Sequence, residues 1–245
     1  MNNNVRFTSR LFCFGKFRPF LILLAASLAG ASLLQAQTVI MQEKFNQKTD
    51  DIDGFSPTKG AESWKKWYDG VISSDGTEAS FKTSGSDSQA RASYPFDWAE
   101  NTIYTLTVTF KFKLKEKDEN GYVGFGFGRG ENADIENSDM PWMLICVPMQ
   151  ASDDARSNGM VGAKEVGQTA IPASDLAAPI MAKMTWNTHT QDVKYFINNE
   201  VQLDWTQKVT PADNGNGCRI FFVGMGSCNT VKVTNVTLTS EPVKK

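Results

Sequence analysis

Histidine is nearly absent from this sequence: His189 is the single one among 245 residues. A Ser-His-Asp triad or a His-based zinc site would have to use it, yet no nucleophile-elbow sequence and no second histidine accompany it. His189 lies in a Thr-His-Thr-Gln-Asp stretch before an expected strand, so we interpret it as a surface turn residue. The sequence therefore predicts neither a catalytic triad nor a metal site.

The Glu-x-Asp-x-x-Glu run of laminarinase-type sandwich glucanases is also missing. The acidic residues between Glu116 and Glu119 lie in an expected turn, not at alternate positions of a strand. Because carboxylates are plentiful elsewhere, a two-carboxylate glycosidase stays open as an alternative. The segment Asp50 to Gly54 could bind calcium loosely, but an acidic surface turn is the commoner explanation, so no cofactor is predicted.

No apolar run has the roughly 20 residues that a membrane-spanning helix needs. The uncharged run from Leu21 to Leu34 is shorter, follows four basic residues without an acidic one, and leads to Ala36, a plausible cleavage position. We therefore expect residues 1–36 to be a signal peptide and residues 37–245 to be one mature domain. The protein is expected to be secreted or periplasmic, without membrane insertion after cleavage.

An excess of basic residues is absent as well. The whole chain has 25 basic and 27 acidic residues, and removal of residues 1–36 leaves 21 basic against 27 acidic, a net charge of about −6. Binding to nucleic acid depends on clustered Lys and Arg. Lysines recur at alternate positions from Lys111 to Lys117, a pattern typical of the solvated face of a strand. No nucleic-acid partner is predicted.

Cysteine is scarce, with four in the chain, of which Cys13 falls in the expected signal peptide. An exported protein can form disulfides, so Cys218 and Cys228 are a possible pair. They flank an expected strand, however, and the chain would have to turn back to bring their Cα atoms within about 7 Å. Cys146 lies in an apolar run and is expected to be a buried thiol.

Helical periodicity is nearly absent, and strand signals dominate the mature chain. From Ile103 to Lys115, apolar residues alternate with threonine and lysine, which predicts a strand with one buried and one wet face. Asn198-Asn199 predicts a tight hairpin, and a shift of parity near Thr234-Asn235 predicts a bulge. Two long segments, Arg129 to Pro141 and Gln150 to Asp175, are predicted loops. Roughly a dozen strands predict an all-β, antiparallel sandwich or jelly roll.

Glycines alternate with large apolar residues in two of these strands, at Gly124 to Gly128 and near Gly224. They do not form a dinucleotide-binding motif, because no helix follows to present its N-terminus to a phosphate. Glycines on one face of neighbouring strands would leave room for large side chains or for a ligand groove. We favour packing.

Aromatic residues provide the candidate ligand-binding site. An exposed indole can stack on a sugar ring, although buried tryptophans are at least as frequent in sandwiches. Several aromatic residues cluster before Asp69-Gly70 or lie at expected strand ends. The candidate ligand-binding residues are Trp64, Trp67, Tyr68, Trp142 and Trp205.

Several of these strands resemble a known family. The stretches Asn101 to Phe110, Gly121 to Phe127, Pro141 to Leu144 and Val193 to Val201 are similar to secreted, concanavalin A-like (laminin-G-like) sandwich proteins of planctomycete and verrucomicrobial bacteria. The resemblance implies a lectin- or glucanase-type sandwich and says little about activity. A second resemblance, of Trp186-Asn187 and the hairpin that follows, is to 3-keto-glycoside hydrolase-like domains.

Three functions follow as hypotheses. The leading one is a secreted, non-catalytic β-sandwich module that binds glycan, such as a polysaccharide, or another cell-surface polymer. The alternative is a glycan-processing hydrolase of the 3-keto-glycoside hydrolase-like or concanavalin A-like type, which requires two or more carboxylates on a concave face. The second alternative is a structural protein of the cell envelope.

Overall fold

The structure is a computed structural model, and it describes residues 37–83, 88–113, 121–130, 139–146, 148, 152–207, 218–226 and 230–244. The chain divides into two units, Met1–Ala36 and Gln37–Lys245, and every described residue belongs to the second. The expected signal peptide therefore lies outside the described residues and stays a prediction. Among the described residues, no helix has the length and apolarity needed to span a membrane.

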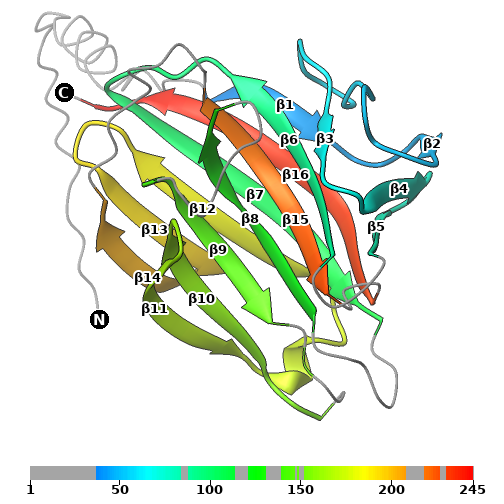
Figure 1. The fold of residues 1–245 in the computed structure, drawn as a ribbon. Coiled ribbons are helices and arrows are strands. Elements are labelled where there is room, and N and C mark those ends of the chain that lie inside the picture. The colour runs from blue at the N-terminus through cyan, green and yellow to red at the C-terminus, as the bar shows by residue number, and fades with distance from the viewer. Residues whose placement is uncertain are drawn as a thin grey trace, which may run out of the picture. The chain divides into compact units, whose positions relative to one another are not determined.

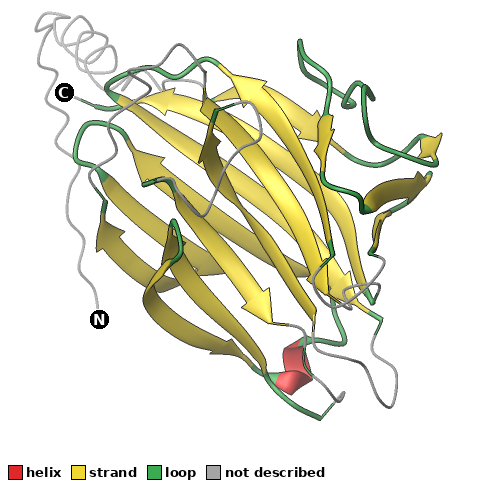
Figure 2. Ribbon diagram, in the orientation of Figure 1, coloured by secondary structure: helices red, strands yellow, loops and turns green. Residues whose placement is uncertain are grey.

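Two antiparallel sheets make up the described unit (Figures 1 and 2). The nine-stranded sheet has the order β14-β13-β12-β7-β16-β5-β4-β2, with β1 paired to β16. Its strands are β1 (Thr38–Glu43), β2 (Lys48–Thr49), β4 (Val71–Asp75), β5 (Ala79–Lys82), β7 (Thr102–Phe112), β12 (Ile180–Asn187), β13 (Asp192–Ile197), β14 (Glu200–Thr206) and β16 (Val231–Pro242).

The seven-stranded sheet has the order β11-β10-β9-β8-β15-β6-β3. Its strands are β3 (Lys65–Trp67), β6 (Gln89–Phe96), β8 (Gly121–Arg129), β9 (Pro141–Cys146), β10 (Ala155–Val161), β11 (Lys164–Ile171) and β15 (Cys218–Gly226). A single 3-10 turn, η1 (Ala173–Asp175), is the helical element of the described residues. The predicted all-β sandwich is confirmed.

The alternating pattern that predicted a strand from Ile103 onward is confirmed in β7. Its apolar residues from Tyr104 to Phe112 are buried, and the intervening threonines and lysine are partly exposed. Strand β7 lies between β12 and β16 in the sheet, which explains why one long run of alternating residues is needed there. The predicted bulge is also confirmed, because the register of β16 against β7 shifts between Val233 and Asn235.

The hairpin predicted at Asn198-Asn199 joins β13 to β14. Both asparagines have positive φ, 49° and 72°, the left-handed conformation that asparagine tolerates better than most residues. His189 lies in the turn before β13, where its backbone N–H donates to Asn187 Oδ1 at 2.9 Å. It is exposed, as expected of a surface turn residue.

One of the two predicted loops is wrong. Most of Gln150 to Asp175 forms the hairpin of β10 and β11, and β10 pairs with β9 as well. The segment is rich in Ala, Ser, Gly and Asp, which have low β propensity. Its strand conformation comes from pairing with the apolar strand β9, a contact that local sequence does not encode. Residues 131–138 of the other predicted loop lie outside the described residues.

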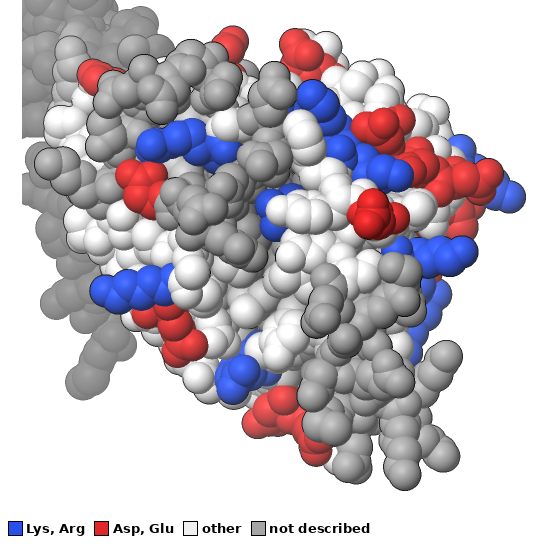
Figure 3. All heavy atoms as spheres, viewed as in Figure 1, with Lys and Arg blue, Asp and Glu red and all other residues white. Residues whose placement is uncertain are grey.

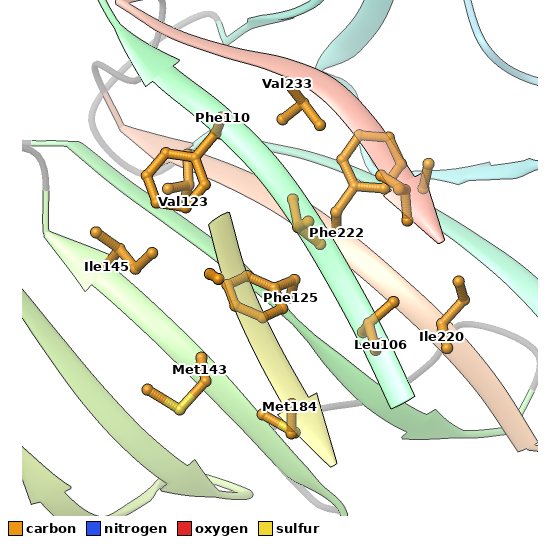
Figure 4. Close-up of a cluster of buried hydrophobic side chains, with 14 of the residues drawn as sticks. Leu106, Phe110, Val123, Phe125, Met143, Ile145, Met184, Ile220, Phe222 and Val233 are labelled. Atoms are coloured by element: carbon orange, nitrogen blue, oxygen red, sulfur yellow. The ribbon is translucent and has the colours of Figure 1, made fainter. Parts of the chain in front are cut away.

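The core lies between the two sheets. Figure 4 shows its centre, where Leu106, Phe110, Met184 and Val233 from the nine-stranded sheet meet six residues of the other sheet. Those six are Val123, Phe125, Met143, Ile145, Ile220 and Phe222. Interdigitation of alternate residues from two inner faces is the usual way in which a sandwich excludes water.

The two glycine-containing strands do not share a glycine face, contrary to the expectation from sequence. In the register of β8 and β15, Gly124 lies opposite Val223, and Gly224 lies opposite Val123. Residues that pair across two neighbouring strands point to the same side of the sheet, whereas residues that follow each other along one strand point to opposite sides. Because Val123 belongs to the core, Gly224 faces inward and Gly124 outward.

Lys111 on β7 and Lys113, directly after the end of β7, both form ion pairs with Glu78. The Glu78 side chain is only 5% exposed. Burial alone would raise the pKa of Glu78, but the hydrogen bonds and charges of the two lysines outweigh it, so that its pKa is lowered from 4.5. These lysines therefore belong to an ion-pair network of the solvated face.

Glu78→Gln is expected to lower the free energy of unfolding by about 1–2 kcal/mol at pH 7. Because folding lowers the pKa of Glu78, its contribution to stability is fully present at pH values above the pKa that Glu78 has in the unfolded chain. This contribution is lost as the pH falls through the lower pKa that Glu78 has in the folded protein. Chemical denaturation of both proteins from pH 7 to pH 3 checks this. The control is Asp204→Asn, which breaks the ion pair between Asp204 and Lys194, whose side chains are 52% and 46% exposed. This substitution should change the free energy of unfolding little at any pH.

Candidate functional site

The outer face of the seven-stranded sheet, the face turned away from the core, brings together side chains from distant parts of the chain. The strand registers place one row of residues side by side across the sheet. From β3 to β10 this row is Trp67, Arg91, Val223, Gly124, Leu144 and Asn158. The row beside it is Lys65, Ser93, Phe221, Gly126, Trp142 and Met160.

An aromatic and cationic cluster occupies the β3 end of this face. Trp67 donates its indole N–H to Ser93 Oγ at 2.9 Å, and Lys65 Nζ lies 4.7 Å from the centre of the Trp67 ring. Tyr68 follows with a positive φ of 72°, and the buried Arg91 guanidinium lies 4.6 Å from the centre of its ring. Cations at these distances attract an aromatic face and hold both rings in place.

Tyr68 and Trp67 are the candidate residues that reach solvent here. Tyr68 is 52% exposed, one of three large apolar or aromatic residues that stand out as exposed in the described part of the chain. A left-handed φ costs a bulky residue free energy and persists only where the surroundings impose it. The backbone thus turns the Tyr68 side chain outward beside the half-buried Trp67.

A surface groove adjoins this cluster. It has a volume of about 350 Å³ and its lining includes Asp53 and Glu62, which are acidic, Lys65 and Arg219, which are basic, and Pro95. A second groove of about 360 Å³ shares Glu62 and Pro95 and continues toward Asp97. Figure 3 shows charged side chains of both signs gathered over β2–β4 at this side of the domain.

The polar groups of the groove provide both acceptors and donors for hydroxyl groups. Asp53 also accepts the Lys66 N–H at 2.9 Å, and Asp51 forms an ion pair with Lys66 at 2.6 Å. The hydrogen bond to Asp51 is the main reason that the pKa of Lys66 is raised. The acidic segment Asp50 to Gly54 therefore packs against β3 and helps to position it.

Three of the five residues expected to bind ligand do not present an open aromatic face. Trp64 is among the residues that line the groove of about 350 Å³, but it is 1% exposed and packs in the core. Trp142 is 4% exposed and its indole N–H donates to the Gly162 carbonyl at 2.7 Å. Trp205 on β14 is partly buried. Its ring packs against Gly159 of β10, where an added Cβ would lie 3.3 Å from the ring. Trp205 therefore closes the space between the edges of the two sheets.

Only Trp67 and Tyr68 of the expected set are thus brought together at a surface. Ser93, Arg219 and Glu62 were missed by sequence reasoning, because nothing in the local sequence shows that β3, β6 and β15 are neighbours. Ser93 is identified by the register that aligns it with Lys65, Arg219 by its hydrogen bond to Ser93, and Glu62 by its place in the groove. These relations exist only in the folded protein.

The outer-face strands offer little for acid-base catalysis. Among their described residues, Glu165 on β11 is the one carboxylate in register with this face, opposite Met160. It accepts a hydrogen bond from Asn158 Nδ2. A glycosidase needs two carboxyl groups flanking the scissile bond. The described strands of this face supply one, and the two carboxylates of the groove, Asp53 and Glu62, lie outside these strands.

The sulfur chemistry is that of free thiols. Cys146 and Cys218 are both free cysteines, and Cys228 lies outside the described residues. Burial raises the pKa of Cys218 to about 11, which keeps the thiol protonated and unreactive. Because Cys228 lies outside the described residues, its possible disulfide with Cys218 stays a prediction. Cys146 is half-buried on the outer face, not fully buried as expected.

No protein-family model matches the sequence, and no curated protein matches it. Solved structures do match its fold. The endo-1,3-beta-glucanase from Streptomyces sioyaensis has a TM-score of 0.53 at 12% identity, over 84% of this chain and 97% of that one. The lectin from Bauhinia forficata in complex with GalNAc has a TM-score of 0.52 at 13% identity, over 81% and 99% of the two chains.

A third similar structure is the CBM2 module of the evolved Dit of Lactobacillus casei BL23 phage J-1, with a TM-score of 0.52 at 10% identity over 86% of this chain and 99% of that one. At such identities the likeness shows the fold alone. The chain has the concanavalin A-like, antiparallel β-sandwich fold of lectins and glucanases. Which function this sandwich performs depends on its own residues.

Proposed function

We propose that this domain is a non-catalytic module that binds glycan or another cell-surface polymer through Trp67, Tyr68 and the adjoining groove. The observation that carries the proposal is the exposed Tyr68 beside Trp67, both held by cations at the edge of the outer face. Aromatic rings stack on the apolar face of a sugar, and nearby polar groups fix its hydroxyls.

Two further points support this proposal. The similar structures include a lectin, a carbohydrate-binding module and a glucanase. The groove supplies carboxylates from Asp53 and Glu62 and donors from Lys65 and Arg219, which is the mixture that a polyhydroxyl ligand can satisfy. We also propose that the protein is exported, because residues 1–36 have the basic segment, the uncharged apolar run and the small residue before the cleavage position that a signal peptide needs.

Trp67→Ala and Tyr68→Ala are each expected to weaken binding to a retained polysaccharide about tenfold, or ~1.4 kcal/mol. Affinity electrophoresis against a panel of soluble polysaccharides measures this. Phe196→Ala is the matched control. The Phe196 ring also contacts a cation, with Lys183 Nζ 4.1 Å from the ring centre, but Phe196 belongs to the nine-stranded sheet and not to the proposed binding surface. Its retention should equal that of the wild type.

Three results would contradict the proposal. The first is the absence of retention on every polymer tested, which would favour the structural role. The second is release of reducing sugar from a retained polymer, which would favour the hydrolase. If binding occurs and the aromatic variants retain full affinity, the ligand binds elsewhere on the domain.

A further inference from the structure

The two surface grooves meet at Glu62 and Pro95, which belong to the lining of both. The first groove, of about 350 Å³, is lined by Lys65, whose Nζ lies over the Trp67 ring. The second groove, of about 360 Å³, follows the end of β6 as far as Asp97. Because the shared residues connect them, the two grooves form one depression, which we call the joined groove.

The joined groove is longer than one sugar ring. Trp67, beside its first part, lies opposite Arg91 on β6, and its second part borders Phe96, the last residue of that strand. At roughly 3.3 Å per residue, the five steps from Arg91 to Phe96 span about 17 Å. A single sugar therefore occupies only part of this length, whereas a chain of several units occupies all of it.

The walls of the joined groove are held in place by backbone hydrogen bonds. The Glu62 N–H donates to the Tyr94 hydroxyl at 3.1 Å, which ties the segment before β3 to β6. The Trp64 N–H donates to the Phe55 carbonyl at 2.9 Å, and the Trp64 carbonyl accepts the Gly54 N–H at 2.9 Å. A site that is already formed loses little binding free energy to the ordering of its own chain.

Charged groups of both signs line the joined groove. Its carboxylates are Asp53, Glu62 and Asp97, and its cations are Lys65 and Arg219. A polymer with an anionic group on every unit would bring some of these groups beside the carboxylates, and a polycation would bring its charges beside the cations. Like charges in close contact disfavour binding. The hydroxyls of a neutral chain avoid both repulsions, since they donate to carboxylates and accept from cations.

We propose that the joined groove binds several consecutive units of a neutral, linear polysaccharide. One unit stacks on Trp67 and Tyr68, and the units that follow extend past Pro95 toward Asp97. Asp97 is exposed and accepts hydroxyl groups from the unit farthest from the aromatic rings. This inference rests on the proposed function and specifies the class of its ligand.

Affinity is expected to increase with the number of sugar units. Laminarin, glucomannan and dextran are the neutral polymers to test by affinity electrophoresis, each beside its carboxymethyl and diethylaminoethyl forms. The neutral form should be retained most strongly. Calorimetric titration with oligosaccharides of the retained polymer, from the disaccharide to the hexasaccharide, should show at least about tenfold tighter binding of the hexasaccharide.

Asp97→Ala tests the far end of the joined groove. It should weaken binding of the hexasaccharide about fivefold and leave binding of the disaccharide unchanged, because only the longer chain reaches Asp97. Tyr68→Ala should weaken binding of both by the same factor. Glu100→Ala is the matched control, since Glu100 is another exposed carboxylate of the described chain but is not among the residues that line either groove. It should bind both as the wild type does.

The failure of this inference differs from the failure of the proposed function. Equal affinity for the disaccharide and the hexasaccharide, or preferred retention of a charged form, would overturn the inference and leave glycan binding intact. Hexasaccharide binding that is the same in Asp97→Ala and in the wild type would overturn the path past Pro95. Retention of no polymer at all would instead contradict the proposed function itself.

Discussion

Replacement of Trp64 by alanine is expected to lower the free energy of unfolding by about 3–5 kcal/mol. The Trp64 ring lies in the core in edge-to-face contact with Phe222 and Tyr94, with ring centres 5.0 and 5.7 Å apart. Its removal takes away the buried contacts and leaves a cavity that neighbouring strands cannot fill. Denaturant unfolding, with the midpoint and slope both measured, gives the value.

Two matched variants separate packing from other effects. Trp64→Phe should cost less than about 1.5 kcal/mol, because the Trp64 indole N–H has no hydrogen-bond partner among the described residues to lose. Trp67→Ala, at the half-buried tryptophan three residues further on, should cost less than Trp64→Ala while abolishing most ligand retention. If the two alanine variants lost equal stability, Trp67 would belong to the core and the proposed binding surface would be wrong.

Gly126→Ala is expected to destabilise the domain by about 1–3 kcal/mol or more, because the new methyl group has no room. A Cβ on Gly126 would lie 2.5 Å from Trp142 Cα and 2.8 Å from the Pro141 carbonyl oxygen. Both atoms belong to the backbone of β9, so a side-chain rotation cannot relieve the overlap. Strands β8 and β9 would have to separate, which would weaken their hydrogen bonds.

Gly124→Ala is the control for this prediction. Its Cβ would lie 3.0 Å from the Trp142 ring and 3.1 Å from Val223 Cγ1, side-chain atoms that can shift by the few tenths of an ångström required. Its one close backbone contact, with the Met143 carbonyl oxygen at 3.2 Å, is longer than those at Gly126. Alanine also loses less conformational entropy than glycine on folding, so the net change should be near zero. Equal destabilisation by the two variants would mean that strand flexibility, not the approach of Trp142, requires these glycines.

These glycines illustrate which part of the sequence-based interpretation holds. Packing is the correct interpretation for Gly124 and Gly126, since Trp142 from β9 and Val223 from β15 occupy the space above them. The expectation that Gly124 and Gly224 share a face was wrong, because the register of β8 against β15 pairs Gly124 with Val223 and Gly224 with Val123. A single strand shows its own alternation, but its offset from its neighbour is a property of the sheet.

The candidate site likewise agrees with the sequence-based prediction in one part and not in another. The expectation that some aromatic residues remain accessible holds for Trp67 and Tyr68, and it fails for Trp64, which is three residues from Trp67 and lies in the core. Composition cannot distinguish them, because an indole has the same apolar surface in either environment. The short strand β3 separates the two by placing Lys65 and Trp67 on the outer face of the sheet.

The sequence by itself determined the fold class. Alternation of apolar and polar residues, as in β7, requires a strand with one buried face, and asparagine pairs and bulges mark where such strands turn or shift. The tertiary structure alone decided which residues share a surface. Trp67, Ser93 and Arg219 come from β3, β6 and β15, and Glu62 meets Pro95 where the two grooves join. Side chains far apart in sequence meet only after the strands have paired, and strand order depends on the fit of the whole core.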